Sequence, residues 1–161
     1  MNLFYLHEDP QICASMHCDK HVVKMIIETA QLLSTAVRTI EPNAPNVYKT
    51  SHLNHPSARW VRANAQNYRW ATLLLKFLGE EYERRYGKRH KTIREVYGSF
   101  AQYEGRMPAG EFYPPPQVVP EQHKRDDTVE AYRSYYHDKL SFIFYKKGGW
   151  PEWLAQPERE I

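Results

Sequence analysis

Five polar side chains recur every three or four residues in the first third of the chain. They are His17, His21, Lys24, Glu28 and Gln31. In an α-helix this spacing follows i, i+4, i+7 and i+11, so all five share one face. The intervening residues are mostly apolar, which predicts a helix buried on most sides. A titratable stripe on such a helix is normally paired or faces a pocket, because an unpaired buried charge is strongly destabilising.

The polar stripe, as we call these five residues, fits a metal-free catalytic or ligand pocket. Lys24 would supply an amine, Glu28 an acid or base, and His17 and His21 a proton or a contact to phosphate. The simplest alternative is a solvated helix face, on which Lys24 and Glu28 form an i,i+4 ion pair and the histidines take no part. The pocket is the preferred interpretation.

A metal site is a further alternative for the same stripe. His17 and His21 form an HxxxH pair, which Asp19 or a histidine within residues 51–55 would complete. The pair lacks the glutamate that makes such a motif specific, so the pattern is a weak indication. No metal and no cofactor are therefore predicted.

A second set of residues is suited to binding a base or nucleotide. Asn64 and Asn67 fall on the apolar arc of a predicted helix, where their amides either tie helices together or meet a base edge. Tyr135 lies outside the apolar arc of the last predicted helix and is placed to stack on a base. The predicted substrate-binding residues are Asn64, Asn67, Arg59, Tyr68, His55 and Tyr135.

Basic residues gather in two further places. Arg62, Arg69 and Lys76 are spaced by seven residues and predict a basic ridge on the helix that carries the two asparagines. The turn at residues 86–91 adds a dense basic cluster. A solvated helix face explains the ridge, and a surface that follows phosphate groups is the alternative.

Length and composition predict one helical domain. The 161 residues carry a formal net charge of +3 and 14% aromatic residues, with no apolar run long enough to cross a membrane. Cys13 and Cys18 lie five positions apart, which suits neither a disulfide scaffold nor a CxxC site. We therefore expect a cytoplasmic protein with reduced cysteines, a single domain over residues 1–161 and no membrane partner.

The predicted fold class is mainly α, a compact single-domain helical array with a short N-terminal extended segment. Residues 2–6 are predicted to be a short strand, and residues 41–55 and the proline-rich 107–122 to be loops. The first predicted helix covers residues 10–40, with a break near His17, and the second covers 57–86 and ends at Gly87. A third, shorter helix is predicted for residues 91–103. The last helix begins at Asp126 or Asp127 as its cap, and its apolar face carries Val129, Tyr132, Tyr136, Leu140 and Ile143.

Several motifs resemble a family of small phage proteins without a settled function. They are HCDKHVVKM at residues 17–25, ETAQL at 28–32, NHP at 54–56, NY at 67–68 and EYERRYGK at 81–88, and the resemblance covers nearly the whole chain. These proteins are distantly similar to the phage pyrimidine-dimer DNA glycosylase/lyase of the endonuclease V type. That enzyme type attacks a sugar carbon with its N-terminal amine and uses a glutamate on its first helix.

The resemblance implies a DNA base-excision glycosylase and abasic lyase that acts through a Schiff base. Met1 and Glu28 would take the roles of the amine and the glutamate, and Lys24 is the substitute amine. The alternative is a non-catalytic phage protein that sequesters a nucleotide or nucleotide-derived signal in the host cytoplasm. A metal-dependent hydrolase is the second alternative. The predicted partner is DNA or a nucleotide-like ligand, although +3 is a mild charge for a duplex binder.

Overall fold

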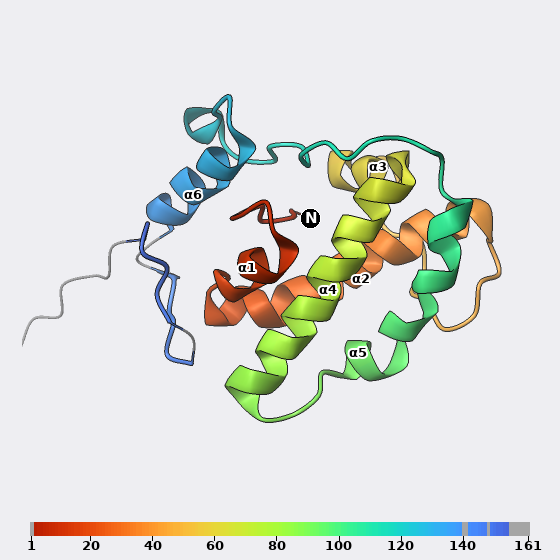
Figure 1. Ribbon diagram of the computed structural model, residues 1–161, viewed down its shortest axis with the longest axis horizontal. Coiled ribbons are helices and arrows are strands. Elements are labelled where there is room, and N and C mark those ends of the chain that lie inside the picture. Colours follow the sequence, from red (N-terminus) through yellow and green to blue (C-terminus); the bar gives the residue numbers. More distant parts are fainter. Residues whose placement is uncertain (1, 140–141, 148, 155–161) are drawn as a thin grey trace, which may run out of the picture.

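The structure is a computed structural model that describes residues 2–139, 142–147 and 149–154. Within these residues the chain forms a compact array of six α-helices and three short 3-10 helices, without a strand (Figure 1). The bounds are α1 Pro10–Ser15, α2 Asp19–Ile40, α3 Pro56–Ala63, α4 Ala65–Tyr86, α5 Lys91–Glu95, η1 Tyr97–Ser99, η2 Ala101–Arg106, η3 Glu121–His123 and α6 Thr128–Asp138. The predicted mainly α class is confirmed.

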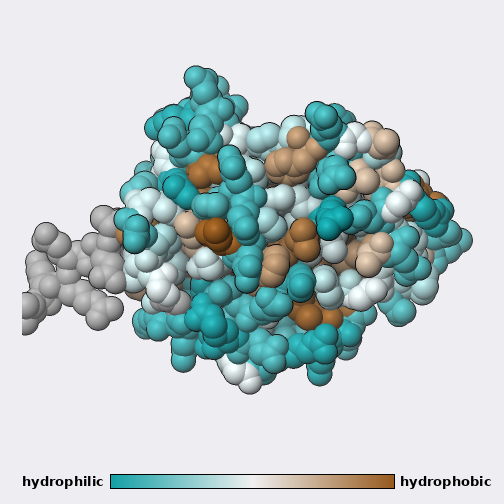
Figure 2. Space-filling view, viewed as in Figure 1, coloured by the Kyte–Doolittle hydropathy of each residue, from teal (hydrophilic) through white to brown (hydrophobic). Residues whose placement is uncertain are grey.

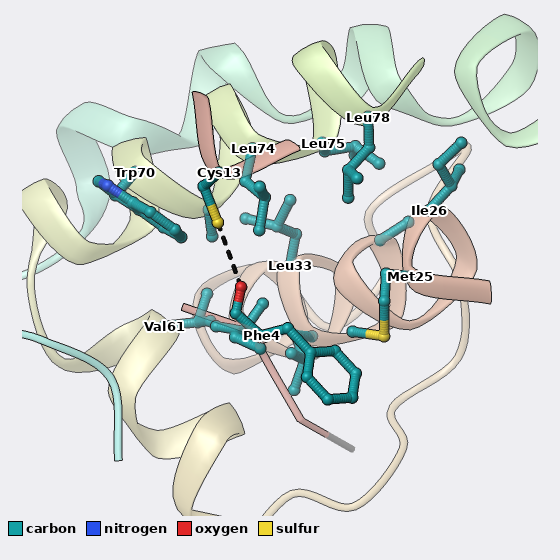
Figure 3. Close-up of a cluster of buried hydrophobic side chains, with 14 of the residues drawn as sticks. Phe4, Cys13, Met25, Ile26, Leu33, Val61, Trp70, Leu74, Leu75 and Leu78 are labelled. Carbon is teal, nitrogen blue, oxygen red and sulfur yellow. Dashed lines mark hydrogen bonds between the residues drawn. The ribbon is translucent and has the colours of Figure 1, made fainter. Parts of the chain in front are cut away.

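The two longest helices, α2 and α4, cross at the centre of the array and contribute much of its core (Figures 1 and 3). Met25 and Leu33 of α2 and Leu74 and Leu78 of α4 are fully buried. Each apolar side chain of this size contributes about 1.5–3 kcal/mol when it is removed from water. The apolar periodicity of the sequence therefore identified the helix faces that pack together.

The first helical stretch is divided, as predicted, near His17. Asp9 caps α1 by accepting hydrogen bonds from the backbone N–H groups of Gln11 and Ile12, at 2.8 and 3.2 Å. The helix ends at Ser15, and α2 begins at Asp19. His17 therefore lies in the turn between the two helices and not on the face of α2.

The second predicted helix, residues 57–86, is wrong as a single element, because the chain breaks at Asn64. Asn64 has extended backbone angles, φ −160° and ψ 167°, and its side-chain oxygen accepts from the N–H of Asn67 at 2.9 Å. An asparagine competes with the helical backbone in this way, so Asn64 ends α3 and caps α4. At the other end Gly87, with φ 72°, stops α4 as predicted.

The helix predicted for residues 91–103 is also shorter in the structure. It ends at Glu95, after which the chain continues through η1 and η2. Val96, with φ −121°, interrupts the α-helical geometry, and Phe100 and Tyr103 bury their rings from the 3-10 segments that follow. Packing of two large aromatic rings against the core here replaces the continuous helix.

The N-terminal segment is buried extended chain and not the predicted strand. Leu3 to Leu6 are all buried, yet no neighbouring strand exists among the described residues to form a ladder. Their backbone groups instead contact side chains. The Cys13 thiol donates to the carbonyl of Phe4 at 3.1 Å, and Arg133 Nε donates to the carbonyl of Leu6 at 2.9 Å. The segment is thus fixed between α1 and α6.

The last helix, α6, is capped by Asp127, which accepts from the N–H of Val129 at 3.0 Å. Tyr132 and Tyr136 are fully buried, as predicted, and Ile143 is buried beyond the end of the helix. Leu140 lies outside the described residues. In the described part of the chain, no helix has the length and apolar character needed to cross a membrane.

Candidate functional site

The polar stripe is only partly buried. His21, Glu28 and Gln31 are half-buried, and the Lys24 side chain is exposed to solvent. Among the described residues no ion pair joins Lys24 to Glu28. The simple surface ion pair is therefore not formed, and the exposed Lys24 corrects the expectation of an amine buried in a pocket.

His17 is a structural residue rather than the catalytic group that the spacing predicted. Its ring is fully buried, and Nδ1 lies 2.8 Å from the carbonyl oxygen of Cys13. A carbonyl can only accept, so Nδ1 carries the proton. Burial lowers the pKa of His17 to about 4, against the effect of that hydrogen bond and with the help of the nearby Arg85 charge. The neutral ring holds the turn between α1 and α2.

His21, by contrast, lies at the surface between α2 and α6. Its ring stacks on Phe4 with centroids 4.3 Å apart, and its Nδ1 is 2.7 Å from the hydroxyl of Tyr136. The same hydroxyl accepts from the N–H of Cys18 at 3.4 Å and donates to the Cys18 sulfur at 3.8 Å. The other ring nitrogen, Nε2, takes no part in the contact with Tyr136.

Positive charge surrounds this half-buried histidine. Burial is the largest cause that lowers the pKa of His21 to about 3, and the neighbouring His17, Lys139, Lys24 and Lys20 contribute to the same shift, in that order. The ammonium of Lys139 lies 4.6 Å from the centroid of the Tyr135 ring, which itself is 6.4 Å from Phe4. We call these residues the α2–α6 cluster: Phe4, His21, Tyr135 and Tyr136, with Lys20, Lys24 and Lys139 around them.

The cluster combines groups that recognise nucleotides. None of its three lysines forms an ion pair with a carboxylate in the described parts of the chain. Unpaired ammonium groups attract phosphate, and Tyr135, which is half-buried, is the aromatic ring of the cluster that has surface for a base, because Phe4 and Tyr136 are buried. Sequence reasoning found His21, Lys24 and Tyr135 as site residues and Lys139 as a basic residue of the last helix, but it did not place Phe4 or Lys139 beside His21, because only the packing of the N-terminal segment and α6 on α2 brings them there.

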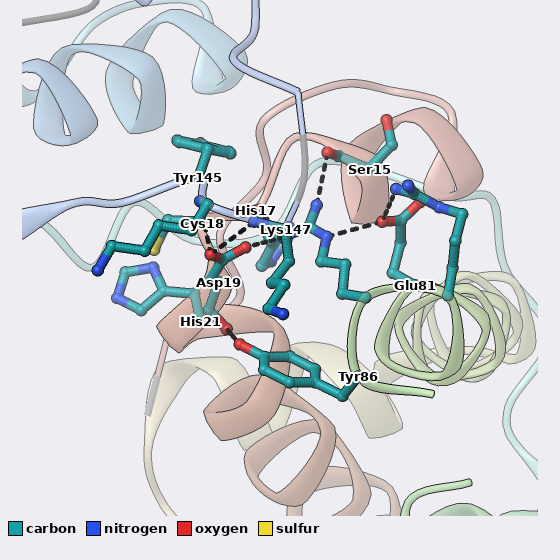
Figure 4. Close-up of polar contacts among 12 residues, drawn as sticks. Ser15, His17, Cys18, Asp19, His21, Glu81, Tyr86, Tyr145 and Lys147 are labelled. Carbon is teal, nitrogen blue, oxygen red and sulfur yellow. Dashed lines mark hydrogen bonds and ion pairs between the residues drawn. The ribbon is translucent and has the colours of Figure 1, made fainter. Parts of the chain in front are cut away.

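Beside the cluster, Arg85 of α4 forms a buried ionic network that the sequence did not reveal (Figure 4). Its guanidinium donates to the carbonyls of Ser15 and His17, at 3.0 and 2.7 Å. It also pairs with Asp19 at 3.3 Å and Glu81 at 2.9 Å, while its side chain is 0% exposed. The end of α1 and the start of α2 are thereby attached to the last turn of α4.

Asp19 has no free oxygen for a metal ion. One carboxylate oxygen pairs with Arg85, and the other accepts from the backbone N–H groups of Lys146 and Lys147 at 2.8 and 3.1 Å. Residues 2–139, 142–147 and 149–154 contain no group of three or more His, Cys, Asp or Glu side chains placed to hold a metal. The HxxxH pair therefore has no ligand set around it there.

Asn64 and Asn67 use their amides within the fold. Besides capping α4, Asn64 donates to the carbonyl of Glu111 at 3.0 Å. Asn67 donates to the carbonyl of Trp60 at 3.0 Å and accepts from the N–H of Tyr113 at 3.3 Å. Of the two roles predicted for these asparagines, tying segments together is the one that the structure supports.

The other predicted substrate contacts lie apart from the α2–α6 cluster. Tyr68 is fully buried and donates to the carbonyl of Phe100 at 2.7 Å, which corrects its assignment as a ligand contact. His55 caps α3 by accepting from the N–H of Ser57 at 3.1 Å, and burial lowers its pKa. Only Arg59 is exposed, at the edge of a hollow of about 400 Å³ that Trp60 also lines.

Met1, the other candidate for the nucleophilic amine, lies outside the described residues. Comparison of the chain with protein-family models, with curated proteins and with solved structures found no match in any of the three. The resemblance to phage glycosylases therefore rests on the sequence motifs alone.

Proposed function

We propose that the protein binds DNA and acts as a base-excision glycosylase and abasic lyase at the α2–α6 cluster. The observation that carries the proposal is the positive charge of three lysines around a half-buried histidine that stays uncharged. DNA phosphates are attracted by such unpaired cations. A base drawn out of the helix would pack against the aromatic rings beside them.

Lys24 supplies the amine in this reaction. The Lys24 ammonium first gives a proton to Glu28. The neutral nitrogen then forms a bond to the sugar carbon that carries the base, the bond between that carbon and the base breaks, and the base leaves with a second proton from the nitrogen. The ring oxygen of the sugar takes the proton from Glu28 as the ring opens. The opened sugar is then held as a Schiff base. Glu28 is half-buried one helical turn beyond Lys24 and supports proton transfer, while His21 donates from Nε2 to a phosphate.

Borohydride trapping tests this chemistry directly, because hydride reduces a Schiff base to a stable covalent adduct. Labelled duplexes that contain an abasic site, uracil or ultraviolet damage are incubated with the wild-type chain, with Lys24→Ala and with Lys49→Ala. We expect an adduct with the wild-type chain and Lys49→Ala and none with Lys24→Ala. Lys49 is the matched control because it is an exposed lysine outside the cluster.

The other outcomes are equally informative. An adduct that survives Lys24→Ala moves the nucleophile to the amine of Met1 and keeps the reaction class. The absence of an adduct on every substrate rejects the glycosylase reaction.

Nucleotide binding without catalysis is the second candidate. The rings of His21 and Tyr135 both pack on Phe4, with centroids 4.3 and 6.4 Å from it, so these two half-buried side chains lie close together beside the lysines. A ligand at a hundred times its Kd raises the free energy of unfolding by about 2.7 kcal/mol. Thermal shifts with mononucleotides, lost in Lys139→Gln, would support this candidate in a chain that forms no adduct.

A further inference from the structure

A second basic surface lies at the turn from α4 to α5, where the polypeptide forms a hollow of about 460 Å³. Its lining residues are Tyr82, Lys88, Arg89, His90, Lys91 and Arg94. Figure 2 shows hydrophilic side chains gathered along this edge of the molecule, below the end of α4. No carboxylate lines this hollow, although Glu80 and Glu83 line the adjoining one.

The shape of the basic hollow is fixed by packed side chains. His90 lies edge-on against Tyr82, with ring centroids 4.8 Å apart, and its Nδ1 accepts from the N–H of Thr92 at 3.1 Å. Burial and the neighbouring Lys88 lower the pKa of His90, so the ring stays neutral. The hollow therefore presents the cations of Lys88, Arg89, Lys91 and Arg94 on a rigid aromatic wall.

Tyr82 of this hollow packs on Tyr86, with ring centroids 5.0 Å apart, and Tyr86 in turn contacts the first turn of α2. The Tyr86 hydroxyl donates to the carbonyl of Asp19 at 3.3 Å, and Asp19 also holds the backbone of Lys146 and Lys147 (Figure 4). All these lysines have exposed side chains, as has Lys20. We call the resulting strip the basic belt; it consists of Lys20, Lys146, Lys147, Lys88, Arg89, Lys91 and Arg94.

Glu80 and Glu83 line the adjoining hollow together with Arg89, without an ion pair to it, and two other neighbouring carboxylates are engaged elsewhere. Asp19 and Glu81 are both engaged by the buried Arg85, and Glu81 also pairs with Arg84. In the described parts of the chain, no cation of the belt forms an ion pair. Seven unpaired cations in a strip exceed what one phosphate needs and suit a polymer of phosphates, such as the backbone of DNA.

We infer that the basic belt, centred on the hollow at the α4–α5 turn, binds the phosphate backbone of DNA beside the α2–α6 cluster. The inference rests on the proposed function for its choice of DNA as the partner. The belt carries the general attraction for the duplex, and the cluster receives the single nucleotide on which the reaction takes place. This division explains how a chain with a mild net charge of +3 can bind a duplex.

Fluorescence anisotropy with a labelled DNA duplex two helical turns long tests the belt. The full chain is compared with the double variant Lys88→Gln/Arg89→Gln and with the control Lys49→Gln/Lys124→Gln. Each double variant removes two exposed cations, so the net charge changes equally. We expect the belt variant to lose at least tenfold in affinity and the slope of log K against log salt to fall by about 2. The control should stay within twofold of the wild-type chain.

Three results would overturn the inference: no binding of the duplex by the wild-type chain, equal losses in the two double variants, or displacement of the duplex by inorganic phosphate as effectively as by unlabelled duplex. The test is independent of the trapping experiment. Duplex affinity that depends on Lys88 and Arg89 supports the belt even if no adduct forms. If the adduct forms but the belt variant binds the duplex as tightly as the wild-type chain, the glycosylase proposal is supported and the belt is rejected.

Discussion

Two groups of positive charge flank the turn between α1 and α2, and they are organised in opposite ways. The Arg85 guanidinium is enclosed by two carboxylates and two carbonyls and has no exposed surface. Lys20 and Lys24 have exposed side chains, and no described carboxylate pairs with them. A buried cation that is paired with two carboxylates and two carbonyls contributes to the fold, whereas an unpaired exposed cation is available to a ligand.

The two histidines of the HxxxH pair follow the same contrast. His17 sits on the Arg85 side, is fully buried and donates to a backbone carbonyl. His21 lies among the lysines and contacts Tyr136 through Nδ1, so Nε2 is not used in that contact. His17 is thus a structural histidine, and His21, only four positions later, is a candidate binding histidine.

The largest expected effect is on Arg85. Arg85→Met leaves the carboxylates of Asp19 and Glu81, which are only 13% and 14% exposed, without their buried partner. We expect the free energy of unfolding at pH 7 to fall by about 3–5 kcal/mol in urea denaturation. The control is Arg84→Met. Arg84 pairs with the same Glu81, but its side chain is 58% exposed, so its loss should lower the free energy of unfolding by less than about 1 kcal/mol. Similar losses in the two variants would contradict the structural role of Arg85.

The next effect is on the pH dependence of stability. Because the pKa of His17 is lowered to about 4, folding favours the neutral ring. This stability is fully present above the unfolded pKa near 6.5 and is lost as pH falls towards 4, at about 1.4 kcal/mol per pH unit and about 3 kcal/mol in all. His17→Asn keeps a donor for the carbonyl of Cys13 and does not titrate, so urea denaturation between pH 7 and pH 4.5 should show a smaller slope.

The control for this measurement is His52→Asn. His52 is exposed and has a φ of 51°, a conformation that asparagine adopts readily, so the substitution should leave both stability and slope unchanged. His21 contributes a slope of the same sign, since its pKa is lowered to about 3. A slope that is identical in His17→Asn and the wild-type chain would show that His17 is not buried in its neutral form.

The sequence predicted the helical class well because apolar periodicity and end signals are local. Asp9 and Gly87 are the cap residues of α1 and α4, as their residue types indicate. The same periodicity runs through Asn64 without interruption, so nothing in the apolar pattern revealed the break there. The break depends on contacts of Asn64 with residue 67 and residue 111, of which the second is 47 positions away.

The candidate site was predicted less completely, because its burial depends on which segments cover α2. The stripe placed five polar groups on one face, but the N-terminal segment and α6 cover His21 and leave Lys24 exposed. Arg85 is one of several charged residues in the motif at residues 81–88, so its residue type alone does not distinguish it there. Its partners Asp19 and Ser15 are 66 and 70 residues away in the sequence. Such long-range pairing cannot be inferred from the spacing of residues along one helix.

The smallest expected effect is on the stability of the lysine variants. Lys20→Gln and Lys24→Gln remove exposed charges without a protein partner, so each should change the free energy of unfolding by less than about 0.5 kcal/mol. Lys139→Gln also loses the contact with the Tyr135 ring and should cost at most about 1 kcal/mol. Urea denaturation and duplex anisotropy on the same samples check both properties. Lower DNA affinity with unchanged stability would confirm that these cations serve a ligand, whereas a loss as large as that of Arg85→Met would place them with the fold.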